Sequence, residues 1–92
     1  MRDEIEIILK QELRLLALRT RASLHITQKE MSELLCMNEK SYSYIETGVY
    51  MCGTSTCVLL LMMQEDSKSF LDELKTKIKK VYEKEMQLVW VQ

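Results

Sequence analysis

The sequence predicts an all-α fold with five helices, and three observations favour it. The 92 residues include no proline and only two glycines, a composition that disfavours turn-rich β domains. Hydrophobic residues make up 47% of the chain, which is enough for one domain with a modest core. Apolar residues also recur at helical spacing in several stretches. We therefore expect a single domain over residues 1–92.

Residues 3–23 have the pattern of a long first helix. Its apolar residues share one face: Ile5, Ile8, Leu9, Leu13 and Leu16. Asp3 is the candidate N-cap, since a side-chain oxygen there can accept a bond from a free backbone N–H. In the connector at residues 23–26, we expect Leu24 and Ile26 to be buried and His25 to be exposed to solvent.

Residues 27–48 predict two short helices joined by a tight turn. Thr27 and Glu30 have the spacing of a capping box at the start of the first helix. Asn38 is the candidate N-cap of the second helix. Gly48 suits the position just after a helix, where glycine is favoured. Two helices this short cannot bury a core alone, so they are expected to pack on the rest of the domain.

This stretch resembles the helix-turn-helix of Cro/C1-type (XRE-family) DNA-binding domains, over roughly residues 13–66. The matching features occur in order: Thr27-Gln28, the small Ser32, the turn at Cys36-Met37, the cap Asn38, and Ile45-Glu46-Thr47-Gly48. The resemblance implies a five-helix Cro/C1 repressor-like domain with extended N- and C-terminal helices. Its helix-turn-helix core would span residues 12–66, and residues 67–92 would form a C-terminal helix for dimerisation.

The sequence departs from the family pattern at two positions. Cys36 stands where glycine is usual, and Tyr42 stands where a smaller aliphatic residue is usual. A residue other than glycine in a left-handed turn is strained by roughly 1 kcal/mol or more. We therefore expect strain at Cys36.

The second helix of the motif supplies the candidate DNA contacts. If Tyr42 and Ile45 face the core, the outward residues are Glu39, Lys40, Ser43 and Tyr44, with Asn38 at the tip. The resemblance implies that the segment Asn38–Ile45 enters the major groove. There a lysine can bind phosphate or guanine, whereas a glutamate can accept from cytosine but repels the backbone. The alternative for each residue is ordinary helix surface.

The resemblance also assigns roles outside the second helix. Gln28 is carried over as a contact to the DNA backbone. Arg21 and Glu46 are carried over as a structural ion pair that stabilises the fold and does not read DNA. A partly buried pair of this kind would contribute more than an exposed one.

The second half of the chain predicts two more helices. Residues 49–53 form a loop that ends at Thr54 or Ser55 as the next N-cap. Cys57–Met63 is apolar nearly all round, which indicates a buried helix. After a polar link, a last helix is expected from Ser69, with a heptad-like seam: Leu71, Leu74, Ile78 and Val81. The apolar end Leu88–Val91 and the isoleucines of the N-terminal extension need a covering surface. A second copy of the chain would supply it in a homodimer, and packing of the two extensions against each other is the alternative.

Other classes of protein are disfavoured. The three cysteines make no disulfide framework, and we expect no metal, redox site or cofactor. We find no nucleophile beside a base, no phosphate-binding glycine loop and no carboxylate pair, so we expect no enzyme. The longest apolar run is far shorter than the ~20 residues that span a bilayer. We expect a cytoplasmic protein without a membrane partner.

Two functions remain open from the sequence. The first is a sequence-specific transcriptional regulator, more specifically a repressor, that binds double-stranded DNA as a homodimer. The second is a protein-interaction module, such as the antitoxin of a toxin–antitoxin pair. The net charge of −1 keeps the second open, because many DNA-binding domains are strongly basic. The position of the basic residues relative to residues 38–44 distinguishes them.

Overall fold

The computed structural model of the protein describes residues 2–49 and 51–90. All the secondary structure in these residues is helical. Side chains are described through Lys84. The elements are α1 (Arg2–Leu24), α2 (Gln28–Leu34), α3 (Glu39–Glu46), α4 (Thr54–Met62) and α5 (Ser67–Trp90). The all-α prediction is therefore confirmed for these residues.

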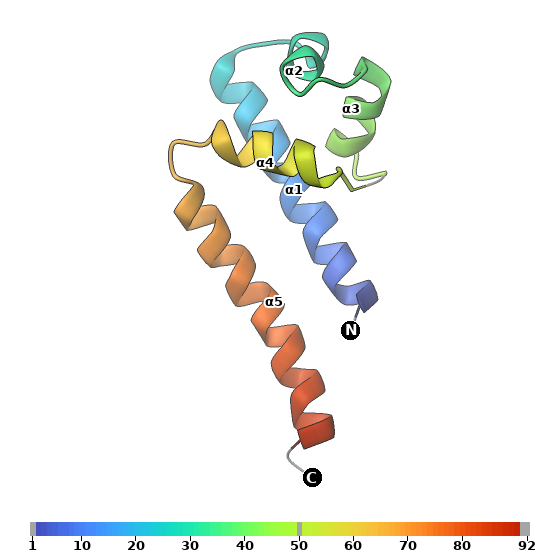
Figure 1. Cartoon of the computed structure of the whole chain (residues 1–92), viewed down its shortest axis with the longest axis vertical. Helices are drawn as coiled ribbons and strands as arrows, with labels where there is room; N and C mark the ends of the chain where they lie inside the picture. Colours follow the sequence, from blue (N-terminus) through green and yellow to red (C-terminus); the bar gives the residue numbers. More distant parts are fainter. Residues whose placement is uncertain (1, 50, 91–92) are drawn as a thin grey trace.

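The long helix α1 organises the domain. Helices α3, α4 and α5 each pack against α1, while α2 packs mainly against α3 (Figure 1). Helix α5 runs beside α1 in the opposite direction, and α4 crosses α1 near its middle. Helices α2 and α3 therefore lie together at one end of the molecule, on the second half of α1.

Every helix contributes to one hydrophobic core. Its fully or nearly fully buried members include Leu16, Ala17, Met31, Tyr42, Ile45, Leu60 and Phe70. Tyr42 is completely buried, and its hydroxyl donates to the carbonyl of Ala17 at 3.5 Å. The prediction that Tyr42 and Ile45 point inward is confirmed. Phe70 shows that the core extends beyond residue 66 into α5.

The local signals of the two short helices are also confirmed. The Thr27 hydroxyl accepts from the Glu30 amide at 3.1 Å, and the Glu30 carboxylate accepts from the Thr27 amide at 3.1 Å. The Asn38 side chain accepts from the Ser41 amide at 2.7 Å. Gly48 follows α3 with a φ of 77°, which glycine adopts without strain. These bonds satisfy backbone groups that the helix ends would otherwise leave unpaired.

The ends of α1 differ from the prediction. The helix begins at Arg2, so Asp3 lies inside its first turn and is not the N-cap. It continues to Leu24, which is exposed rather than buried. His25 then adopts a left-handed φ of 55°, and its amide bonds to the Ala22 carbonyl. This turn directs Ile26, and not Leu24, toward the core. His25 is exposed, as expected.

Helix α4 differs in its start and in its burial. It begins at Thr54 with Gly53 at the N-cap position, so neither Thr54 nor Ser55 caps it, and no side chain does. Leu60 is fully buried, but Met62 is 75% exposed. The prediction of a buried helix is therefore wrong for one side of α4. A short helix lying across α1 can cover only one of its sides with residues of this chain.

Helix α5 begins two residues earlier than predicted. Asp66 caps it, since its carboxylate accepts from the Ser69 amide at 3.1 Å and from the Ser69 hydroxyl at 2.6 Å. The predicted seam is only partly correct: Leu74 packs on the core and Val81 is buried, but Leu71 is exposed. Phe70 is the core residue at that level instead. The apolar end Leu88–Val91 lies outside the described side chains.

Cys36 makes a first testable prediction. It is exposed and adopts a left-handed φ of 57°, so the strain expected at this turn position is present. Cys36→Gly should raise the free energy of unfolding by about 0.5–1 kcal/mol, because glycine removes the left-handed strain without losing packing. Urea unfolding at 25 °C measures this. Cys36→Ala keeps the Cβ and is the control: an equal gain there would contradict strain as the cause.

Candidate nucleic-acid interface

The carboxylate of Glu46, at the end of α3, connects three helices. It accepts from Arg21 of α1 through two bonds, from Nε at 2.6 Å and from Nη2 at 3.1 Å. It also accepts from the Gln28 amide of α2 at 2.9 Å. Arg21 further donates to the Ile26 carbonyl at 3.2 Å. The ion pair expected from the sequence is thus present, and it fixes α3 relative to α1 and α2.

The ionisation of Glu46 follows from these contacts. Burial alone would raise the pKa of its carboxyl, but hydrogen bonds from Arg21, Tyr42 and Gln28 outweigh burial and lower that pKa. The same pairing raises the pKa of Arg21. Burial raises the pKa of the Tyr42 phenol, which stays neutral. The site therefore holds a charged carboxylate and guanidinium beside a neutral phenol.

Gln28 has a role that sequence analysis missed. Its amide nitrogen donates to Glu46, so one of its two N–H groups is committed inside the protein. A contact to a DNA phosphate would have to use the second N–H group of this half-buried side chain. Gln28 and Glu46 are 18 positions apart in the sequence, and the bond between them depends on how α2 and α3 pack.

The outward face of α3 presents several polar groups. Lys40 is exposed, and its Nζ lies 6.0 Å from the centre of the Tyr44 ring. Ser43 and Tyr44 are half-buried, whereas Asn38 and Glu39 are exposed. Asn38 uses its side-chain carbonyl as the cap of α3, which leaves the amide nitrogen as its donor toward a ligand.

Thr47 belongs with this face, although sequence analysis missed it. It is exposed and follows Lys40 and Tyr44 at the spacing i, i+4, i+7, which places the three on one side of a helix. Its hydroxyl donates to the Ser43 carbonyl at 3.1 Å. The helical spacing was the signal that could have identified it.

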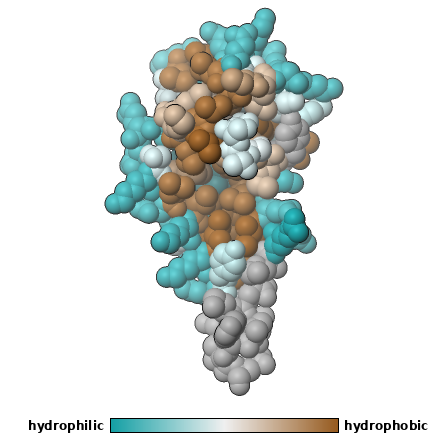
Figure 2. Space-filling model, viewed as in Figure 1, coloured by the Kyte–Doolittle hydropathy of each residue, from teal (hydrophilic) through white to brown (hydrophobic). Residues whose placement is uncertain are grey.

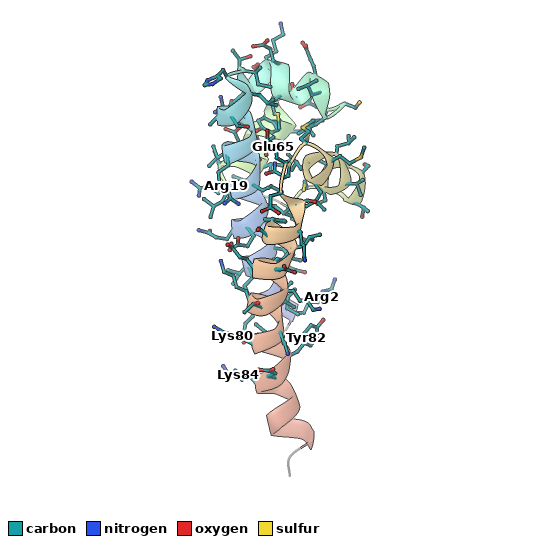
Figure 3. The ribbon with its side chains drawn as sticks, turned by 90° about the vertical axis from the view of Figure 1, so that its left-hand side faces the viewer. Arg2, Arg19, Glu65, Lys80, Tyr82 and Lys84 are labelled. Atoms are coloured by element: carbon teal, nitrogen blue, oxygen red, sulfur yellow. The ribbon has the colours of Figure 1, made fainter. Side chains whose placement is uncertain are left out.

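The charges around this face are mixed. Residues 27–48 include two cations, Lys29 and Lys40, and four glutamates, of which Glu46 is neutralised by Arg21. Many of the other lysines belong to α5, and Figure 3 shows Lys80 and Lys84 pointing to the side away from α4. These two lysines therefore add no positive charge beside residues 38–44.

A second surface stands out by its apolar character. It consists of exposed or half-buried residues of α4 and α5, which we call the apolar face: Val58, Met62, Leu71, Leu74, Ile78 and Tyr82. The α5 members line an open groove whose margin carries Lys75 and Lys79. Figure 2 shows hydrophobic residues on one face of the molecule, over α4 and down along α5.

Within the described part of the chain, no three His, Cys, Asp or Glu side chains converge as metal ligands would. No helix there combines the length and the apolar character needed to cross a bilayer. No protein-family model, curated protein or solved structure shows significant similarity to the chain.

Proposed function

We propose that this protein is a sequence-specific DNA-binding transcriptional repressor that acts as a homodimer. The observation that supports it is the arrangement of α2 and α3: two capped helices, joined by the four residues 35–38. The Glu46 contacts hold α3 with its outward face free of the core. In helix-turn-helix proteins such a second helix is the element that enters the major groove.

The proposed contacts follow from the side chains on α3. Lys40 would bind a phosphate or a guanine edge, and Ser43 and Tyr44 would contact bases or phosphates. The Asn38 amide would donate at the tip of the helix. Glu39 would accept from a cytosine amino group, and it would disfavour phosphates placed nearby.

The mixed charge of residues 27–48 determines how strongly the affinity for DNA should depend on salt concentration. Each phosphate contact by a lysine or arginine releases condensed counterions and steepens the dependence of affinity on salt. Only two lysines lie within residues 27–48, so that dependence should be shallow. Discrimination between operator and random sequence would then rest on hydrogen bonds and apolar contacts to bases.

The contribution of Lys40 can be measured directly. Lys40→Ala should weaken binding to operator DNA and reduce the slope of log K against log salt by about one, as expected for one lost phosphate contact. The measurement is a titration of operator and random duplex at several salt concentrations. Lys80→Ala is the control, because Lys80 lies on α5 and points away from α4 (Figure 3).

Unchanged affinity and slope for Lys40→Ala would remove Lys40 from the interface. Binding to no duplex at low salt would contradict the proposed function as a whole. If only affinity falls, with the slope unchanged, Lys40 contacts a base and not a phosphate.

Homodimerisation is proposed from the apolar face. Val58, Met62 and Leu71 are about half or more exposed in the single chain. The α5 members of the apolar face line one groove, and apolar patches of this kind mark interaction sites in soluble proteins. A second copy is the partner that a two-fold operator requires, since two α3 helices about one DNA turn (~34 Å) apart can read two half-sites.

The second candidate function is a protein-interaction module, such as an antitoxin. The observation that favours it is the combination of the apolar face with the small number of cations in residues 27–48. It predicts that the purified chain neither binds DNA nor self-associates. The regulator predicts both properties, so the two measurements together separate the candidates.

A further inference from the structure

The loop between α3 and α4 brings two cysteines together. Cys52, just before α4, is buried in the core cluster, and Cys57 is half-buried within α4. Their sulfur atoms lie 2.8 Å apart, and the Cys57 Sγ is 3.7 Å from the Cys52 carbonyl. The third cysteine, Cys36, is exposed in the turn between α2 and α3. The sequence predicted no redox use for any of them.

We propose that Cys52 and Cys57 form a modification site at which a hydroperoxide converts two thiols into an intrachain disulfide. The Cys57 thiolate attacks the peroxide, which releases hydroxide (or alkoxide) and leaves a sulfenic acid on Cys57. The Cys52 sulfur then displaces water from that sulfenic acid as the S–S bond forms. Overall the two thiols lose two protons and two electrons. Hydrogen peroxide is reduced to two molecules of water, and an organic hydroperoxide is reduced to one water and one alcohol.

The geometry favours this pairing over any other. A disulfide bond is about 2.05 Å long, so the two sulfurs need to approach by less than an ångström. Cys57 is the accessible partner, because it is half-buried whereas Cys52 is buried. Burial raises the pKa of the Cys52 thiol, which suits the resolving rather than the attacking role.

The sequence allows a clean test on the full chain. Trypsin cleaves after Lys29, Lys40 and Lys68, so residues 41–68 hold both paired cysteines and residues 30–40 hold Cys36. The protein is treated with hydrogen peroxide at low molar excess, quenched, unfolded, alkylated and digested. We expect peptide 41–68 to be lighter by two hydrogens and to carry no alkyl group. Reduction before alkylation should restore two alkyl groups.

Two variants sharpen the result. Cys36→Ser should form the disulfide at the wild-type rate, because Cys36 takes no part. Cys57→Ser should not form it, and its remaining thiols should be alkylated. The proposal is overturned if wild-type peptide 41–68 takes two alkyl groups under conditions that oxidise Cys36. It is also overturned if Cys57 is oxidised to a sulfinic acid without a disulfide, or if the bond joins Cys36 to either partner.

Discussion

Replacing Arg21 with methionine should lower the free energy of unfolding by about 2–4 kcal/mol at neutral pH. Removing one partner of a buried ion pair typically costs ~3–5 kcal/mol, because the remaining charge is left in a poorly solvated site. Here that charge is Glu46, whose side chain is 4% exposed. Arg21 itself is 28% exposed, and water that enters its place moderates the loss.

The loss should depend on pH in a defined direction. In the wild type the pKa of Glu46 is lowered, so its contribution is present above the unfolded-state pKa and disappears as pH falls through the folded-state pKa. Without Arg21 the pKa of Glu46 should rise, because burial is then opposed only by the hydrogen bonds from Tyr42 and Gln28. The variant should therefore lose less stability than the wild type as pH falls. The difference between the two proteins should therefore narrow from pH 7 toward pH 4.

Urea unfolding of both proteins across this pH range measures the effect. Arg19→Met is the matched control, because Arg19 is an exposed residue on the same helix and should change stability little. A double-mutant cycle with Glu46→Gln isolates the coupling between Arg21 and Glu46. Additive effects, with no coupling, would contradict the assignment of this pair as a stabilising contact between α1 and α3.

The parts of the fold that could be predicted are those set by neighbouring residues. The Thr27–Glu30 capping box, the Asn38 cap and the glycine turn after α3 depend on side chains within a few positions of each other. The inward direction of Tyr42 follows from helical spacing. Local signals of this kind fix where a helix begins and ends without reference to the rest of the chain.

The rest depends on packing between segments far apart in sequence. The bond from Gln28 to Glu46 spans α2 and α3, and the core position of Phe70 is set by how α5 lies on α1. The pattern of α4 indicated burial on all sides, but the chain covers only one side. The approach of Cys52 to Cys57 follows from the path of the loop before α4. The spacing of apolar residues in the sequence does not predict these arrangements.

The apolar face leads to the second large effect, on self-association. The proposed function requires a dimer, and Leu71 lies in the α5 groove while remaining 46% exposed in the single chain. Leu71→Glu should therefore leave the fold of the monomer intact. In a dimer it would bury an unpaired carboxylate, which costs several kcal/mol unless the group is paired.

We expect Leu71→Glu to raise the dimer dissociation constant by about 100-fold or more, equivalent to ~2.8 kcal/mol. The measurement is sedimentation equilibrium of the intact chain at micromolar concentrations, with circular dichroism to verify helix content. Thr76→Glu introduces the same charge on the opposite side of α5, in the surface formed with Asp72, Glu73 and Lys80, and is the control. It should dimerise like the wild type.

A chain that ends at Lys80 tests whether the residues after Lys80 contribute to the interface. It lacks Tyr82 but keeps the other five members of the apolar face, so it should stay dimeric if those five are sufficient. If it folds but becomes monomeric, the residues after Lys80 supply the contact, and the interface extends along α5. An intact wild-type chain that is monomeric at micromolar concentration would contradict the dimer itself. The apolar face would then be a surface for a different protein, as the interaction-module candidate requires.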